Sequence, residues 1–228
     1  LPLFVQTLLG YTATDAGLVI SPGGLALMLM MPVVGMLSGK IDARWLIALG
    51  FVGCALSLYW MTRFYGQIDY ATIAWARTYQ SVPLALLFIP INTVAMAAMP
   101  MAKSNNASAI INMVRNIGGS VGISLATTLI ARREQYHQSV LVKHTTSLSS
   151  QYSTAVHALQ QAYLAYSGSA VDALHQAQAQ IYAMVQRQAA FLSFNDAFWV
   201  MAIILVAMVP LAFLMRKPPP GAVPVPAH

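Results

Sequence analysis

Two arginines lie well inside long apolar stretches of the sequence, and they are the residues best placed to do chemistry. Arg77 and Arg115 each have several apolar residues on either side. A charged side chain is costly in a membrane, so it usually pairs with another group, lines a polar cavity or marks a transport pathway. Reaching out to the interface with the long side chain is the alternative. We treat both arginines as candidate substrate or coupling residues.

Polar and aromatic side chains share a helix face with each arginine. Successive helical residues turn by about 100°, which aligns Arg77 with Gln80, Ser81, Phe88 and Asn92, and Arg115 with Asn112, Asn116, Gly119 and Gly122. Such faces line a cavity or pack through buried amide hydrogen bonds. We predict a substrate or coupling pathway formed by Arg77, Gln80, Phe88, Asn92, Asn112, Arg115 and Asn116.

Glycines recur at helical spacing in two of the apolar stretches. Small residues let membrane helices approach each other closely. We therefore predict helix-packing positions at Gly35, Gly39, Gly118, Gly119 and Gly122. Lining a cavity is the alternative for the last three of these residues.

The remaining ionisable residues do not form a reaction centre. All six acids lie outside the apolar stretches or at their ends, and the five histidines lack the close spacing of a metal site. We expect no catalytic residues, no metal and no cofactor, and a chain that is not an enzyme. A proton-driven carrier needs a titratable group within the membrane, so we expect the proton-coupling acids outside this segment.

The composition shows which elements must position these residues. Of 228 residues, 58% are hydrophobic and 8% charged, and the mean hydropathy is +0.64. A soluble domain carries about 25% charged residues, so this composition excludes an ordinary soluble enzyme or a nucleic-acid module and requires a lipid bilayer. About 20 apolar residues cross the hydrocarbon as a helix. We predict an all-α polytopic membrane protein with spans at about 17–39, 45–64, 71–98, 108–131 and 197–215, and with residues 1–9 ending a sixth helix.

Basic residues in the short connections predict the orientation. Lys40, Arg44, Lys103, Arg216 and Lys217 share one side, which the positive-inside rule makes cytoplasmic. We expect four parts: residues 1–131 as a membrane bundle, 132–196 as an outer loop, 197–215 as the last transmembrane helix, and 216–228 as a disordered cytoplasmic tail.

The outer loop is rich in Gln, Ser, His, Tyr and Ala and has apolar residues at helical spacing on both sides of Ser167-Gly168-Ser169. This pattern predicts a hairpin of two amphipathic helices, and a flexible connector is the alternative. Because the chain lacks an initiator Met, we expect it to be part of a longer protein.

Three short motifs carry a resemblance to a known family. They are GKIDAR at Gly39–Arg44, ARTYQS at Ala76–Ser81 and NMVRNIGGSVG at Asn112–Gly122. Their order resembles the C-terminal half of the EmrB/QacA-type drug:proton antiporters, the fourteen-helix branch of the major facilitator superfamily. The resemblance implies a major-facilitator-type C-terminal bundle in the bacterial inner membrane, driven by the proton gradient, that exports small amphipathic substrates by alternating access.

The resemblance also implies roles for individual residues and partners. Arg77 and Gln80 match the fourth-helix motif Arg-x-x-Gln-Gly, while Ser81 replaces its glycine and puts close packing there in doubt. Lys40, Asp42 and Arg44 match a conformational-switch loop. The implied partners are the N-terminal half of the same transporter, a periplasmic adaptor protein docked on the hairpin, and an outer-membrane channel. The alternatives are a non-transporting anchor or receptor whose hairpin binds a protein, and an exporter of a single metabolite.

Overall fold

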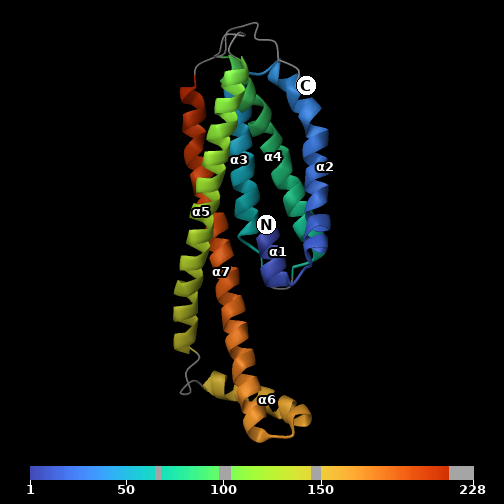
Figure 1. Ribbon diagram of the computed structural model, residues 1–228, viewed down its shortest axis with the longest axis vertical. Helices are drawn as coiled ribbons and strands as arrows, with labels where there is room; N and C mark the ends of the chain where they lie inside the picture. Colours follow the sequence, from blue (N-terminus) through green and yellow to red (C-terminus); the bar gives the residue numbers. More distant parts are fainter. Residues whose placement is uncertain (65–67, 98–103, 145–149, 216–228) are drawn as a thin grey trace. The chain divides into compact units, whose positions relative to one another are not determined.

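The computed structural model describes residues 1–64, 68–97, 104–144 and 150–215. In these ranges the chain forms helices and no strand (Figure 1), which confirms the all-α class. The helices are α1 (Pro2–Leu9), α2 (Ala13–Ser38), α3 (Ala43–Met61), α4 (Tyr70–Ala97), α5 (Ser104–His144), α6 (Ser150–Ser167) and α7 (Ala170–Leu214). Two compact units result: residues 1–125 with 197 onward, and residues 126–196.

Local signals account for the first helix boundaries. Gly10 has φ 71°, a left-handed conformation that suits glycine, and it ends α1. The Thr12 hydroxyl accepts a hydrogen bond from the Asp15 backbone N–H at 3.2 Å and so caps α2. Asp42 caps α3 in a related way, since its carboxylate accepts from the Arg44 N–H at 3.3 Å.

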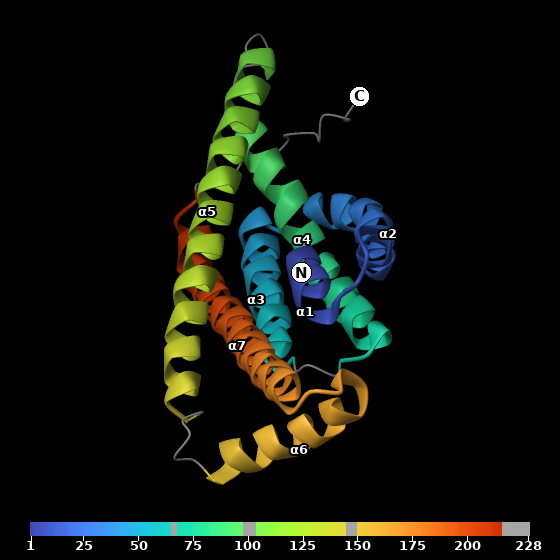
Figure 2. The ribbon, with the colours of Figure 1, turned by 60° about the horizontal axis from the view of Figure 1, so that its bottom comes forward.

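Helix α4 organises the first unit, because it packs against both α2 and α3 (Figure 2). The packing is close enough to require glycine. A Cβ added at Gly53 of α3 would lie 2.6 Å from the Pro83 Cβ of α4, and one at Gly50 would lie 2.8 Å from Leu87. These small residues let the backbones of α3 and α4 approach each other.

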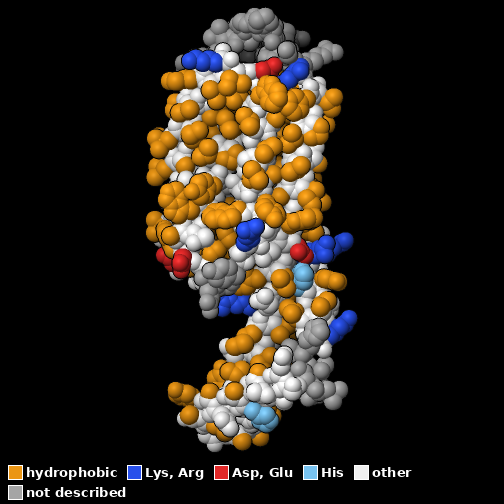
Figure 3. All heavy atoms as spheres, turned by 180° about the vertical axis from the view of Figure 1, so that it is seen from behind, with side chains coloured by type: hydrophobic (Ala, Val, Ile, Leu, Met, Phe, Trp, Pro, Cys, Tyr) orange, Lys and Arg blue, Asp and Glu red, His pale blue; other side chains and the backbone are white. Residues whose placement is uncertain are grey.

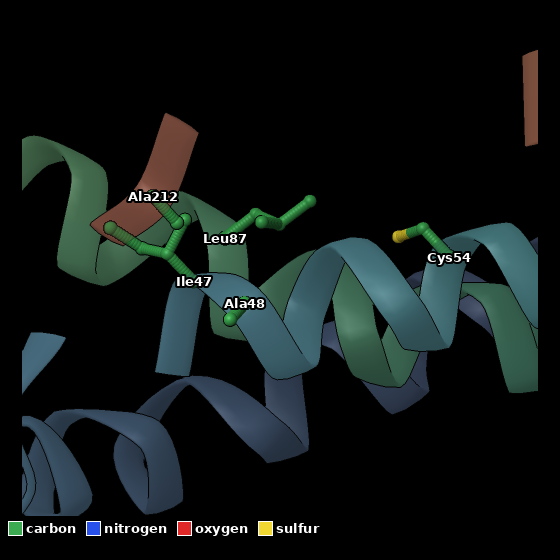
Figure 4. Packing of buried hydrophobic residues seen from close by; sticks show 5 residues of the cluster. All are labelled: Ile47, Ala48, Cys54, Leu87 and Ala212. Carbon is green, nitrogen blue, oxygen red and sulfur yellow. The ribbon is translucent and has the colours of Figure 1, made fainter. Parts of the chain in front are cut away.

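A buried apolar cluster joins α3 and α4 to the end of α7. Figure 4 shows its five fully or nearly buried members, which are Ile47, Ala48, Cys54, Leu87 and Ala212. At the other end of α3, the Phe4 ring of α1 packs near those of Phe64 and Phe198, with centroids 5.9 and 6.2 Å away. The C-terminal part of α7 therefore belongs to the same bundle as α1 and α3.

The outer surface of this unit is apolar. Large hydrophobic side chains stay exposed along its helices, for example Leu29 at 72% and Met36 at 74%. Hydrophobic side chains cover much of the face in Figure 3. Such a surface matches a lipid environment.

Among the described residues, four helices are long and apolar enough to cross a membrane: α2, α3, α4 and α7. They overlap with four of the five predicted spans, and residue 98 at the end of the third span lies outside the described residues. The fifth, 108–131, lies within α5, which is not among the four because Asn112, Arg115, Asn116 and its glycines lower its hydropathy. That α5 crosses the membrane remains a prediction.

In the second unit, most of the described residues between 132 and 196 are helical, and their position outside the membrane remains a prediction. Helix α5 continues to His144, and α7 runs from Ala170 without a break into the predicted last span. The physical reason is that residues 123–144 and 170–209 contain neither glycine nor proline. Helices α6 and α7 follow each other across Gly168, which has φ 64°, where the sequence predicts a turn. Helix α7 continues past residue 190, and the hairpin itself remains a prediction.

Candidate functional site

Arg77 lies at the α2–α4 contact, where it makes the first of two polar clusters. Its guanidinium Nη1 donates to the Gln80 Oε1 at 2.7 Å, one turn along α4. A Cβ added at Gly23 of α2 would lie only 2.5 Å from the Arg77 Cγ. The arginine is therefore held on one side by its own helix and on the other by the backbone of α2.

The Arg77 cluster borders an open cavity of about 420 Å³. The cavity is lined mainly by α1 and α2, through Pro2, Gln6, Ala13, Ala16, Gly17, Ile20, Ser21 and Gly24, with Arg77 from α4. The buried Arg77 Nε has no hydrogen-bond partner in the described structure. A buried donor without a partner is unfavourable, so this nitrogen is a polar group that the described helices leave unsatisfied.

Arg115 is the centre of the second cluster, which joins α4 to α5. Its Nη2 donates to the Asn92 Oδ1 at 2.6 Å, and its Nη1 lies 3.5 Å from the Asn112 Oδ1. Its Cζ lies 5.0 Å from the centroid of the Phe88 ring, within the range of a cation–π interaction. Asn92 in turn donates to the Phe88 carbonyl at 2.7 Å.

The structure thus brings together four of the seven predicted pathway residues, Phe88, Asn92, Asn112 and Arg115, and separately pairs Arg77 with Gln80. Along α4, the 15 residues from Arg77 to Asn92 correspond to about 22 Å at 1.5 Å per residue. The two clusters are therefore distinct. The seventh residue, Asn116, contributes its backbone carbonyl to the Ser120 hydroxyl at 2.9 Å, and its side chain is exposed.

The predicted packing glycines differ from those that pack. A Cβ added at Gly35, Gly118, Gly119 or Gly122 would meet nothing within 4 Å, and one at Gly39 would meet only the Met36 carbonyl of its own turn. Close packing at these five positions is therefore not what the described structure shows. Gly23, Gly50 and Gly53 make the close contacts within this structure. Gly50 and Gly53 are three residues apart, a helical spacing that could have identified them, whereas Gly23 has only its neighbour Gly24.

The predicted switch loop lies between α2 and α3. Lys40 is exposed, its N–H bonded to the Leu37 carbonyl at 3.0 Å, and Asp42 caps α3. The Arg44 Nε is buried and has no hydrogen-bond partner in the described part of the chain. The structure therefore gives Asp42 a clear local role, and the role in switching remains a prediction.

One polar contact in the second unit has no counterpart among the predicted residues. The His137 Nε2 of α5 lies 2.8 Å from the Asp196 Oδ2 of α7, and the Arg133 Nε lies 3.6 Å from the same oxygen. His137 and Asp196 are 59 residues apart, so no local spacing could have predicted the pair. The contact joins α5 to α7 within this unit.

Comparisons with known proteins place these features in a family. The profile of the Major Facilitator Superfamily matches residues 1–133. The chain is 30% identical over 219 residues, 96% of its length, to the fatty acid resistance protein FarB of Neisseria gonorrhoeae. It is 30% identical over 223 residues, 97% of its length, to the multidrug export protein EmrB of Escherichia coli strain K12. It is 31% identical over 219 residues, 96% of its length, to the probable multidrug resistance protein EmrY of the same strain.

The chain spans about two fifths of the length of these relatives, 41% of FarB and EmrY and 42% of EmrB, and it matches their C-terminal part. This agrees with the resemblance drawn from the short motifs. Together with the apolar helices, the relatives indicate a multi-pass membrane protein. The chain belongs to the Major Facilitator Superfamily.

Proposed function

We propose that the chain is the C-terminal part of a proton-driven exporter of amphipathic or hydrophobic compounds that works by alternating access. The observation that carries this proposal is the Arg115 cluster, a charged and aromatic group on two helices of an otherwise apolar bundle. Such residues mark transport pathways because their cost in a membrane must be offset by function. The names of the relatives, a multidrug export protein and a fatty acid resistance protein, support the same class of substrate.

The energy source in this proposal is the proton gradient, with no cofactor. No acid lies within the predicted spans of this chain, so the proton-carrying acids belong to the part of the longer relatives that the chain does not cover. Arg77 and Gln80 assist proton transfer or the conformational change that it drives. Lys40, Asp42 and Arg44 act at the cytoplasmic side during that change.

The hairpin of α6 and the start of α7 is the docking element for a periplasmic adaptor, which connects to an outer-membrane channel. This places the hairpin outside the cytoplasm and the C-terminus inside, with the transporter in the bacterial inner membrane. Exposed tyrosines support a docking role, since Tyr166 is 89% and Tyr182 52% exposed, and tyrosine is enriched at protein interfaces.

The full-length protein tests the proposal in cells that lack other exporters. We expect the cells to accumulate less of an amphipathic dye than control cells, and a protonophore to abolish the difference. Arg115→Ala removes the cluster, so it should restore accumulation while leaving the protein level in the membrane unchanged. Purified full-length protein that exports no amphipathic compound under a proton gradient would contradict the proposal.

The non-transporting anchor or receptor predicts the opposite pattern, in which Arg115→Ala and Asn112→Ala leave function intact and deletion of 150–190 abolishes it. The export functions of the relatives do not favour this alternative. Export of a single metabolite would appear as one substrate responding in the accumulation assay while dyes and drugs do not.

A further inference from the structure

The Arg115 guanidinium carries a positive charge that the described residues do not neutralise. Its side chain contacts the amide oxygens of Asn92 and Asn112 and the Phe88 ring, all of which are uncharged. The acids of the same unit, Asp15, Asp42 and Asp69, lie in the first turn of α2, at the cap of α3 and just before α4. The cluster therefore has a net charge of +1.

The geometry leaves this charge accessible. Arg115 is exposed, and the Phe88 ring beneath it is 45% exposed. Arginine has five N–H donors in a planar fork suited to a carboxylate. The amide oxygens of Asn92 and Asn112 accept hydrogen bonds from two of these donors. These bonds fix the orientation of the guanidinium before a ligand binds.

The neighbouring face of α5 provides room beside the charge. Gly118, Gly119 and Gly122 follow Arg115 at helical spacing, and a Cβ at any of them would meet nothing within 4 Å. Glycine presents only backbone and no polar side chain. An alkyl chain can lie along this face while its head reaches the arginine.

We propose, resting on the proposed export function, that the Arg115 cluster binds the headgroup of an anionic amphiphile, a long-chain carboxylate. The carboxylate accepts hydrogen bonds from the free N–H groups of Arg115, and the alkyl chain lies over the glycine face of α5. The net charge of +1 favours anions over cations of the same shape. Phe88 and Asn92 are positioning residues, because they hold the guanidinium.

The phosphate of a lipid headgroup is another oxyanion that could bind Arg115. The depth of Arg115 in the membrane distinguishes this phosphate from the carboxylate of an amphiphile. Arg115 lies seven residues inside the predicted span 108–131, about 10 Å along the helix at 1.5 Å per residue. A hydrocarbon core is about 30 Å thick, with the phosphates outside it. This depth favours the carboxylate of a mobile amphiphile.

The test is binding to purified full-length protein in a neutral detergent. The probes are laurate, dodecanol and dodecylamine, which share a twelve-carbon chain and differ in charge. We expect wild-type protein to bind laurate most tightly and Arg115→Gln to weaken laurate binding about tenfold, the effect of losing one or two charge-assisted hydrogen bonds. Dodecanol binding should not change, and Arg115→Lys should restore laurate binding in part, since it keeps the charge and loses the fork.

Arg63→Gln is the matched control. Arg63 also lies near an aromatic ring, with its Cζ 5.9 Å from the Tyr59 centroid, and it follows the end of α3. Its loss removes the same charge outside the cluster, so laurate binding should stay at the wild-type level.

Several results would overturn the inference. Equal loss of laurate and dodecanol binding in Arg115→Gln would show a structural role. Unchanged laurate binding, with less phosphatidylglycerol co-purifying with Arg115→Gln, would assign the charge to a lipid. The wild type could export amphiphiles with no dependence on headgroup charge, while Arg115→Gln leaves laurate binding unchanged. This result would contradict the inference and leave the export function intact. Binding of laurate through Arg115 without proton-driven export would contradict the function alone.

Discussion

At the residue scale, Gly23 and Ser81 compensate for each other across the α2–α4 contact. Ser81 replaces the glycine of the motif that this helix resembles, yet it is only 1% exposed, and its hydroxyl donates to the Arg77 carbonyl at 2.9 Å. The close approach is possible because the facing residue on α2 is Gly23, where a Cβ would lie 2.8 Å from the Ser81 Oγ. A small residue on each helix, Ser81 on α4 and Gly23 on α2, therefore permits close packing at this point.

Gly23→Ala should destabilise the protein by about 1–3 kcal/mol, the usual cost of inserting a methyl group into a packed contact. Its Cβ meets the Arg77 side chain at 2.5 Å and the Arg77 carbonyl at 3.1 Å. Tryptophan fluorescence during thermal unfolding of the purified protein measures the change. Gly24→Ala is the control, since a Cβ there meets nothing within 4 Å. A Gly23→Ala melting temperature equal to that of Gly24→Ala would contradict the packing argument.

At the element scale, polar side chains link the long helices α5 and α7 in the unit of residues 126–196. Asp196 accepts from His137 at 2.8 Å and faces Arg133 at 3.6 Å, and it is the last acid before the uncharged run 197–214. Gln138 adds a second link from α5 to α7 by donating to the Tyr182 hydroxyl at 3.2 Å. These polar contacts fix the register between the two helices within the unit, because apolar contacts alone are not directional.

Asp196→Asn should loosen this contact. It removes the charge that attracts Arg133 and weakens the hydrogen bond to His137, with an expected cost of about 1 kcal/mol, since both partners are partly exposed. Hydrogen–deuterium exchange of the full-length protein should become faster in the peptides around 133–140 and 192–197. His137→Gln keeps a side-chain donor and should exchange more slowly than His137→Ala. Unchanged exchange in Asp196→Asn would show that the pair does not hold the helices.

At the scale of the whole molecule, the proposed orientation makes the hairpin and the α2–α3 connection lie on opposite sides of the membrane. Tyr166 in α6 and Lys40 after α2 are both exposed and suit this comparison. In a full-length variant without other cysteines, Cys54 included, we expect Tyr166→Cys to react with a membrane-impermeant maleimide in spheroplasts. Lys40→Cys should react only after the membrane is permeabilised. The reverse pattern would invert the orientation.

The sequence by itself determined that lipid surrounds the chain, that the fold is all-α and which residues are the main candidates for function. A charged fraction of 8% requires lipid, and the apolar runs locate the helices, because hydrophobicity and helical periodicity are properties of neighbouring residues. The same local rules placed Arg77 and Arg115 among polar partners on their own helices. They also predicted the turn at Gly168, which the structure contains.

Only the tertiary structure decided which residues meet across helices. The Arg115–Asn92 bond joins residues 23 apart and the His137–Asp196 pair joins residues 59 apart, and both depend on how two helices cross and in what register. For the same reason the sequence did not identify the glycines that are covered within this structure, since whether a glycine is covered depends on the helix opposite it. Gly23, Gly50 and Gly53 lie against α4, whereas Gly118, Gly119 and Gly122 face open space beside a charged residue.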